Sequence, residues 1–107
     1  MQQKPGHKSV EKESSDPNIE YVLRLFITGT SPNSVRAIKN LRDICEEHLK
    51  GRYSLEIIDV YQQAALAKEE QIIALPLLIK KSPGPQRRLI GDMSETAKVL
   101  KGLGLQP

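Results

Sequence analysis

Few side chains in this sequence could carry out catalysis or hold a metal. The 107 residues include one cysteine, Cys45, and two histidines. A single cysteine forms no intramolecular disulfide, and one cysteine with two histidines lacks the number and spacing of ligands that a zinc site needs. The remaining residues supply no nucleophile paired with a general base. The sequence therefore predicts binding rather than catalysis, with no cofactor and no metal, and it fits a reducing cytoplasm.

One short stretch concentrates positive charge. Residues 80–88 contain four basic side chains and no acid, around a Ser-Pro-Gly-Pro turn: Lys80, Lys81, Arg87 and Arg88. Such a stretch suits an anionic partner, either nucleic acid or an acidic protein surface. It equally suits a solvated hairpin that Lys and Arg protect from aggregation. Single-strand nucleic-acid grooves use aromatic stacking platforms, and three tyrosines and one phenylalanine are too few to favour that partner.

Composition predicts a single soluble domain behind a disordered tail. Hydrophobic residues make up 38% and charged residues 27% of the chain, and no apolar run approaches the roughly 18 residues of a membrane span. Residues 1–20 mix proline, glycine, serine and both charge signs without periodicity and without a secretory apolar run. We expect a disordered tail over 1–20, one domain over 21–107, and a cytoplasmic protein. The net charge of +3 then divides into −1 for the tail and +4 for the domain.

The first half of the domain predicts a parallel strand–helix–strand unit. Residues 21–28 (YVLRLFIT) are apolar on both faces, as in a central strand. Ser31 is the expected N-cap of a helix with Pro32 at its first position, and Gly51 is the expected C′ residue. One face of this helix should bury Val35, Ile38, Leu41, Ile44, Cys45 and Leu49. Residues 53–61 form the second strand, and a crossover of this kind requires a parallel pair.

The second half predicts a helix, an antiparallel hairpin and a last helix. Their ranges are a helix over 62–71, strands over 77–81 and 87–90, and a helix ending near Gly102. Asp92 and Glu95 have the spacing of a capping box at the start of that last helix, which should bury Ala97, Leu100 and Leu103. The element order is βαβαββα, an α/β fold with a four-stranded mixed sheet.

This order resembles the thioredoxin fold. Thr30-Ser31-Pro32-Asn33 stands where thioredoxins carry Cys-Gly-Pro-Cys, and Pro76 stands where thioredoxin-like domains place a cis-proline. Both cysteines of the redox motif are missing. Without a low-pKa thiolate at the helix N-terminus, disulfide exchange is excluded.

A closer resemblance, over residues 20–103, is to the KaiB family of circadian clock proteins. The matching runs are Tyr21-Val22-Leu23-Arg24-Leu25, Ser31-Pro32-Asn33-Ser34-Val35-Arg36-Ala37, Ile57-Ile58-Asp59-Val60, Ala65-Leu66-Ala67 and Arg87-Arg88-Leu89-Ile90-Gly91-Asp92-Met93-Ser94. The chain departs from the family at Leu75, usually threonine, at the Pro83-Gly84-Pro85 turn, and in lacking the acidic C-terminal tail of the cyanobacterial clock forms. A stress-related homologue that has lost clock function is therefore an alternative to a clock component.

The resemblance implies a non-enzymatic regulatory adaptor. Members of this family dock onto a KaiC-like ATPase ring, help to sequester a KaiA-like protein and displace a histidine kinase. In the family the second half of the chain, here residues 62–103, exists either as a thioredoxin-like continuation or as an alternative packing found in tetramers. Only the thioredoxin-like state binds the ATPase. We expect that state, mostly monomeric, to predominate here, because the turn and helix signals of the second half favour it; a dimer or tetramer belongs to the alternative fold.

Two groups of residues follow as candidate sites. Partner binding is assigned to the basic residues Arg36, Lys39, Arg87 and Arg88. The balance between the two folds is assigned to Tyr21, Pro76, Gly91, Asp92 and Ser94. Simpler roles are core packing for Tyr21, a turn and an N-cap for Gly91 and Asp92, and a solvated helix face for Arg36 and Lys39.

One enzymatic alternative stays open. A thioredoxin-like domain without redox cysteines could bind glutathione, with Ser31 or Ser34 steadying a thiolate or phosphate at the helix N-terminus. No second domain is present to hold an acceptor substrate, and this alternative therefore has less support than the adaptor.

Overall fold

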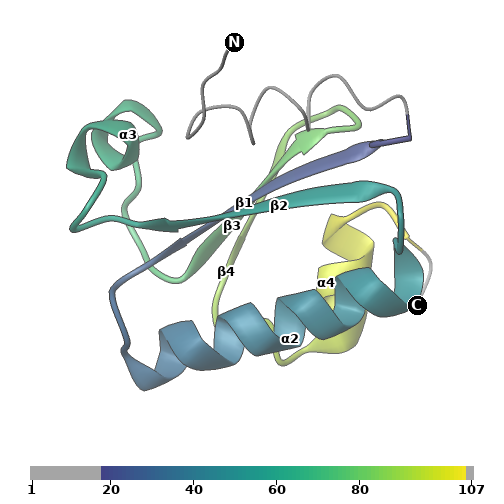
Figure 1. Cartoon of the computed structure of the whole chain (residues 1–107), viewed down its shortest axis with the longest axis horizontal. Coiled ribbons are helices and arrows are strands. Elements are labelled where there is room, and N and C mark those ends of the chain that lie inside the picture. Colours follow the sequence, from purple (N-terminus) through teal and green to yellow (C-terminus); the bar gives the residue numbers. More distant parts are fainter. Residues whose placement is uncertain (1–17, 106–107) are drawn as a thin grey trace, which may run out of the picture.

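Seven helices and strands make up the part of the chain that the computed structural model describes, residues 18–105. Their order is β1 (Tyr21–Ile27), α2 (Pro32–His48), β2 (Tyr53–Asp59), α3 (Ala64–Glu69), β3 (Leu77–Ser82), β4 (Arg87–Ile90) and α4 (Thr96–Gly102) (Figure 1). This confirms the predicted βαβαββα order, with element ends displaced by a few residues. The predicted tail lies outside the described residues up to position 17. Glu20, the last residue of the predicted tail, lies within the described residues, and its amide donates a hydrogen bond to the Arg52 carbonyl at 2.9 Å.

The four strands form one mixed sheet in the order β2-β1-β3-β4. β1 runs parallel to β2 and antiparallel to β3, and β3 pairs antiparallel with β4. β1 is central because its side chains are apolar on both faces, as its sequence predicted. The parallel crossover and the hairpin are both confirmed, and the edge strands are β2 and β4.

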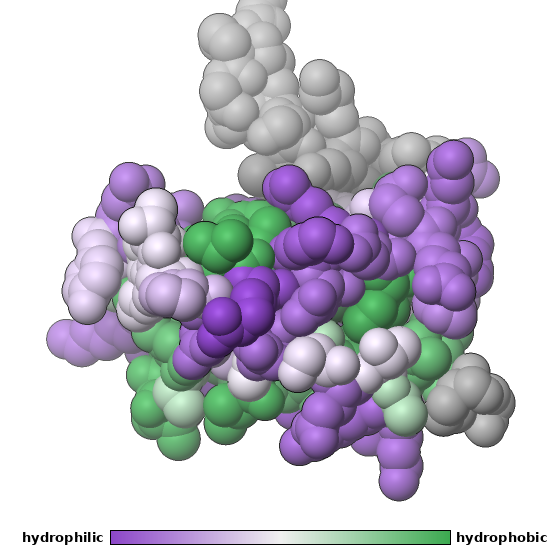
Figure 2. All heavy atoms as spheres, turned by 90° about the horizontal axis from the view of Figure 1, so that it is seen from below, coloured by the Kyte–Doolittle hydropathy of each residue, from purple (hydrophilic) through white to green (hydrophobic). Residues whose placement is uncertain are grey.

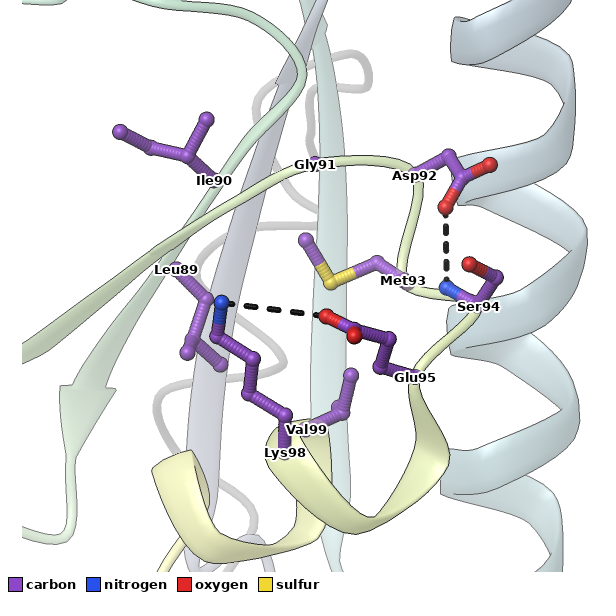
Figure 3. A pocket seen from close by; sticks show the side chains of 9 residues that line it. All are labelled: Leu89, Ile90, Gly91, Asp92, Met93, Ser94, Glu95, Lys98 and Val99. Atoms are coloured by element: carbon purple, nitrogen blue, oxygen red, sulfur yellow. Dashed lines mark hydrogen bonds and ion pairs between the residues drawn. The ribbon is translucent and has the colours of Figure 1, made fainter.

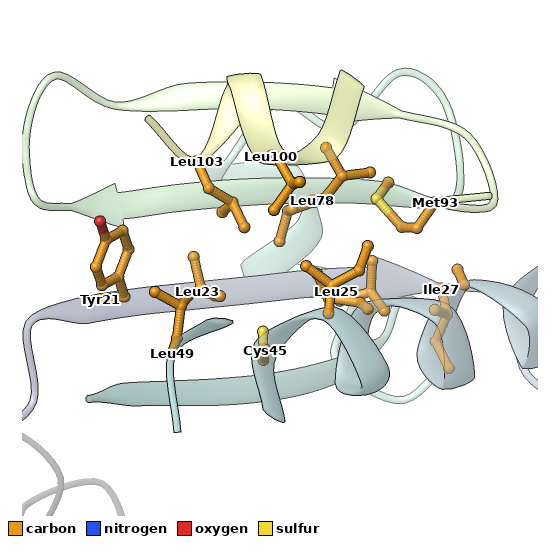
Figure 4. Close-up of a cluster of buried hydrophobic side chains, with 14 residues drawn as sticks. Tyr21, Leu23, Leu25, Ile27, Cys45, Leu49, Leu78, Met93, Leu100 and Leu103 are labelled. Carbon is orange, nitrogen blue, oxygen red and sulfur yellow. The ribbon is translucent and has the colours of Figure 1, made fainter. Parts of the chain in front are cut away.

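Each face of the sheet carries its own hydrophobic core. On one face, α2 and α4 cover alternate residues of β1, and their buried side chains meet in the cluster of Figure 4, which includes Tyr21, Leu23, Leu25, Ile27, Leu78, Met93, Leu100 and Leu103. On the other face, Phe26, Ile58, Leu77 and Ile79 form a smaller cluster against the α3 region. Figure 1 shows α3 on the side of the sheet away from α2 and α4. The second core is the thinner one, since α3 has no fully buried residue.

Helix α2 begins as predicted but buries a different stripe. Ser31 is the N-cap and accepts a hydrogen bond from the Ser34 amide, with Pro32 in the first turn. The expected burial of Val35 is wrong, because its side chain is 54% exposed and Ser34 and Ala37 are buried instead. The helix ends one residue earlier than expected.

The C-cap of α2 is Leu49, and Gly51 therefore lies two positions beyond it rather than at C′. Gly51 still adopts a φ of +79°, which explains glycine there.

The last helix also differs from its prediction at the start. The N-cap is Glu95, which makes no side-chain capping hydrogen bond, and Asp92 instead accepts from the Ser94 amide at 3.1 Å. The capping box is therefore wrong: the chain turns through Asp92 and Met93 before the helix begins. Ala97 is exposed, whereas Leu100 and Leu103 are buried as predicted. Two further expectations are confirmed, a cis Leu75–Pro76 bond and a buried Tyr21.

Candidate functional site

The start of α2, where a thioredoxin would carry its redox cysteines, holds only hydroxyl groups that bond to one another. Ser31 Oγ donates to Ser34 Oγ at 2.8 Å, and the Thr28 amide donates to Ser34 Oγ at 3.1 Å. Ser34 is buried, so its hydroxyl is committed to holding the β1–α2 loop closed. These hydroxyls build the helix start and offer no activated nucleophile.

Cys45 is equally unsuited to chemistry. It is fully buried in the core under α2, and burial, with a smaller effect from Glu46, raises the pKa of its thiol to about 12. Over residues 18–105, no group of three or more His, Cys, Asp or Glu side chains comes close enough to hold a metal ion. Over the same span, no helix has the length and apolar character to cross a membrane.

The most constrained surface feature is the turn Gly91–Ser94 between β4 and α4. Gly91 has a φ of +125°, and Met93 has a φ of +63°, a left-handed conformation that few non-glycine residues adopt. The Met93 side chain is buried in the main core, which holds the turn in this shape. A positive φ in a buried, non-glycine residue costs free energy that the surrounding packing must supply. The turn is thus fixed by the fold rather than free.

Two side chains of helix α2 bind Asp92 in the same turn. Arg36 Nε lies 3.1 Å from Asp92 Oδ2, and Asn40 Nδ2 donates to the Asp92 carbonyl at 3.0 Å. Hydrogen bonding to Ser94, followed by the Arg36 guanidinium, lowers the pKa of the Asp92 carboxyl below its usual value. Arg36 and Asp92 are 56 residues apart in sequence, so this contact joins the two halves of the domain.

A cavity of about 230 Å³ lies between the turn and α4. Figure 3 shows Leu89, Met93 and Val99 on its wall and the Lys98–Glu95 ion pair, 3.8 Å long, across its mouth. The charged and polar lining residues are Asp92, Ser94, Glu95 and Lys98, of which Glu95 and Lys98 pair with each other and Asp92 with Arg36. Its size suits a single side chain of a partner, with an apolar wall on one side and a charged wall on the other.

The structure separates the four basic residues that the sequence grouped together. Arg36 and Lys39 are exposed on α2, where Lys39 pairs with Asp43 at 2.8 Å. Arg87 and Arg88 are consecutive in β4 and point to opposite faces of the sheet, since Arg87 pairs with Lys80 and Arg88 with Ile79. Arg36 therefore forms one surface with the Gly91–Ser94 turn, whereas Lys39 lies further along α2 beside Asp43. The two β4 arginines do not join that surface as a single patch. Figure 2 shows the face over α2 and α4 as mainly hydrophilic with separate apolar patches.

The basic stretch 80–88 is not one solvated patch either. Lys80 is buried and its ammonium donates to the Pro83 carbonyl; burial, then the nearby Arg87, lowers its pKa. Lys81 and Arg88 both turn toward Glu70 at the end of α3. Arg87 is the one member exposed without a recorded ion pair among the described residues. The stretch is largely used inside the fold.

Sequence analysis missed the ionic cluster around Glu70, the most connected polar group described. Its carboxylate is 13% exposed and lies 2.7 Å from Lys81, 3.2 Å from Arg24 and 3.7 Å from Arg88. The hydrogen bond from Lys81, with the charges of Lys81, Arg24 and Arg88, outweighs burial and lowers the pKa of Glu70. Arg88 also donates to the Glu70 carbonyl at 2.6 Å. Apart from the excess of basic residues nearby, no sequence signal marks this cluster, because its members are brought together by the sheet.

Of the five residues assigned to the balance between the two folds, four lie close together in the structure. The Gly91 amide donates to the Pro76 carbonyl at 3.0 Å, which joins the starting point of β3 to the end of β4. Asp92 and Ser94 share the turn described above. Tyr21 lies at the other end of β1, where Arg52 stacks over its ring at 5.7 Å. The structure thus places Pro76, Gly91, Asp92 and Ser94 together and Tyr21 apart.

Comparison with known proteins gives one consistent result. A family model described as the KaiB domain matches residues 24–105. A Picosynechococcus protein named circadian clock oscillator protein KaiB is 52% identical over 85 residues, which cover 79% of this chain and 82% of the relative. The protein of the same name from Prochlorococcus marinus is 48% identical over 89 residues, covering 83% of this chain and 75% of the relative.

Solved structures agree on the fold. The N-terminal domain of Synechococcus elongatus SasA superposes with a TM-score of 0.64 at 26% identity, covering 77% of this chain and 80% of that domain. The thioredoxin Deadhead of Drosophila melanogaster superposes with a TM-score of 0.69 at 11% identity, covering 91% and 90%. The second similarity shows the fold alone, which confirms the predicted thioredoxin-like class.

Proposed function

Because this chain belongs to the KaiB domain family, we propose that it is a clock-related regulatory adaptor that acts by binding and not by catalysis. Its partner is a KaiC-like ATPase ring, and a KaiA-like protein or a histidine kinase takes part in the same assembly. The protein works in the cytoplasm, without a cofactor. The family match supports the clock-related role, and the similarity to the SasA domain supports interaction with clock proteins.

The observation that carries the proposal is the joined surface of α2 and the Gly91–Ser94 turn. The two family runs that the sequence shares most distinctively, Ser31–Ala37 and Arg87–Ser94, meet there through the Arg36–Asp92 ion pair. Arg36 and Lys39 are exposed beside a turn of fixed shape and a small cavity, and each is paired with an aspartate that an acidic partner would replace, Asp92 for Arg36 and Asp43 for Lys39. Positive surface charge steers an acidic partner, and a fixed turn gives it a defined register.

The second half of the chain also has the properties of a segment with two accessible packings. Helix α3 has six residues and none fully buried, and α4 has seven residues without a side-chain cap. Two packings of one sequence can interconvert only if their free energies differ by a few kcal/mol, and short, weakly buried elements suit that requirement. The Arg36–Asp92 pair and the Gly91–Pro76 hydrogen bond belong to the thioredoxin-like arrangement. We propose that this arrangement, as a monomer, is the binding-competent state.

Association with the ring tests the proposal directly. The KaiC-like ATPase from the same genome is immobilised, and binding of the chain is followed by biolayer interferometry. Arg36→Glu with Lys39→Glu should slow association by about tenfold, because rim charges act mainly on the association rate. Lys68→Glu, on exposed α3 at the opposite face, is the matched control and should bind as the unmodified chain does. No binding by the unmodified chain refutes the ATPase partner, and equal rates for the double variant and the control place the interface elsewhere.

The glutathione alternative gains no support from the structure. Ser31 and Ser34 direct their hydroxyls at each other and at Thr28 instead of outward. Saturable chemical shifts at residues 30–36 on adding glutathione would favour that enzyme over the adaptor.

A further inference from the structure

The open edge of the sheet at β4 combines features that suit one kind of partner. β4 is the last strand in the sheet order, so one side of its backbone pairs with β3 and the other side pairs with no described strand. The Gly91 amide points inward to the Pro76 carbonyl. Because backbone direction alternates along a strand, the N–H and C=O groups of Arg88 and Ile90 point outward. Two donors and two acceptors are thus presented at this edge.

A groove of about 320 Å³ lies over the end of this edge. Its lining includes Ile73, Leu77 and Ile90 from the α3 side of the sheet and Leu89 and Lys98 from the α4 side. Side chains from both faces can line one groove only where it crosses the edge. The groove therefore follows the path that an added strand would take.

The two walls of the groove differ in chemistry. On the α3 side, Ile73 is 91% and Ile90 57% exposed, a large apolar area for neighbouring surface residues. On the α4 side, the charged lining residue is Lys98, and Arg87 points to the same face of β4. Both charged residues of the lining, Arg88 and Lys98, are basic. Arg88 lies on the α3 side beside Ile90, where Glu70 already pairs with it, and Lys98 shares its charge with the exposed Glu95. An added strand therefore meets mainly apolar surface on the α3 face, and on the α4 face it meets Lys98 and Arg87, which has no recorded ion pair among the described residues.

We propose that the β4 edge binds an extended segment of an acidic partner protein in which apolar and acidic residues alternate. Successive side chains of a strand point to opposite faces, so alternation places the apolar residues against Ile73 and Ile90 and the acidic residues against Arg87 and Lys98. A second copy of this chain does not meet the requirement. Pairing of β4 with β4 would bring Arg87, Arg88 and Lys98 of both copies together, and like charges across a strand pair repel.

This inference does not depend on the ATPase partner, since its test uses a peptide alone. The probe is an acetylated and amidated six-residue peptide of alternating glutamate and valine, and the control peptide has lysine in place of glutamate. Titration into the ¹⁵N-labelled full chain is followed by amide chemical shifts. We expect saturable shifts centred on residues 87–91, 73–74 and 98 for the glutamate peptide and none for the lysine peptide. No saturable shifts, or equal shifts for both peptides, overturns the proposal.

Two variants of one residue separate the backbone from the side chain. Ile90→Pro removes the outward N–H without removing a hydrogen bond to β3, and edge strands tolerate proline at such positions. Ile90→Ser loses the same side chain but keeps the N–H. We expect the proline variant to bind the glutamate peptide at least tenfold more weakly than the serine variant. Equal affinities overturn strand addition.

A third variant and the oligomeric state complete the test. If Ile90→Pro does not fold, Ile73→Ser removes exposed apolar area away from the strand backbone and should weaken binding several-fold. Tyr61→Ser, which removes a side chain that is 79% exposed and outside the groove lining, should not. Unchanged binding by Ile73→Ser contradicts the proposal. Sedimentation showing a dimer of the unmodified chain that Ile90→Pro abolishes would also overturn it, because a second copy would then occupy the edge.

Discussion

Replacing Glu70 by glutamine removes the charge at the centre of the ionic cluster while keeping the side chain's shape. The carboxylate ties the end of α3 to three strands, through Arg24 on β1, Lys81 on β3 and Arg88 on β4. It is the best-buried member of the cluster, and its partners keep 28% to 37% of their side chains exposed. Because α3 buries little else, this cluster should supply much of what holds it to the sheet.

The expected cost follows from the burial of the partners. A hydrogen bond to a charged group contributes about 1.5–3 kcal/mol when it is well buried, and an exposed ion pair contributes about 0.2–1 kcal/mol. The cluster lies between these limits, and glutamine keeps one acceptor oxygen for Lys81. We therefore expect Glu70→Gln to lower the free energy of unfolding by about 1.5 kcal/mol at pH 7. In a domain of this size that corresponds to roughly 8 °C in Tm.

The pH dependence identifies the charge as the cause. The pKa of Glu70 is lowered in the folded protein, so its stabilisation is fully present above the ordinary carboxyl pKa of 4.5 and is lost as pH falls through the folded value. Urea unfolding followed by circular dichroism at pH 7 and at steps below pH 4.5 should show the difference between the two proteins shrinking in acid. Glu69→Gln, at an exposed neighbour with no recorded ion pair among the described residues, should unfold like the unmodified protein throughout. A Glu70→Gln protein as stable as this control, or a difference that persists undiminished in acid, would refute the reasoning.

Three further outcomes follow from the same structure. Gly102→Ala should destabilise the fold by about 1–2 kcal/mol in urea unfolding, because its Cβ would lie 2.4 Å from a leucine side chain of β4; unchanged stability would show that this leucine moves freely. Cys45 should react with a thiol reagent at pH 7.5 only in denaturant, since burial raises its pKa to about 12; rapid labelling of the native protein would contradict its placement. In a carboxyl NMR titration, Asp92 should titrate below its usual pKa, held there by Ser94 and then by Arg36, and Arg36→Ala should move the midpoint upward; no movement would mean that the ion pair does not form in solution.

Patterns among neighbouring residues predicted the helices and strands correctly. Several predictions about single residues were wrong, because contacts between residues far apart in the sequence determine those features. Ser31 and Pro32 define the start of α2 through chemistry within one turn, and this was predictable from the sequence. Val35 is apolar at a helical interval, yet it faces outward because the sheet meets α2 at Ala37 and Leu41. Periodicity gives the width of an apolar stripe, and only the packing gives its direction.

The candidate site shows the same division. Asp92 and Glu95 have the spacing of a capping box, but Asp92 is drawn to Arg36 of α2 and to the Ser94 amide. Because Arg36 is 56 residues from Asp92 in sequence, the residues around Asp92 give no signal that predicts this contact. The Glu70 cluster escaped prediction for that reason, since the sheet assembles it from four separate segments.

The central claim is that the free chain presents α2 and the Gly91–Ser94 turn together, in the thioredoxin-like arrangement that we propose binds the ring. Backbone NMR assignment at several protein concentrations tests it most directly, because secondary chemical shifts report the fold and signal widths report association. We predict helical shifts over Thr96–Gly102, strand shifts over Leu77–Ser82 and Arg87–Ile90, and the tumbling of a monomer. Strand shifts over 96–102 together with the mass of a tetramer would contradict the claim.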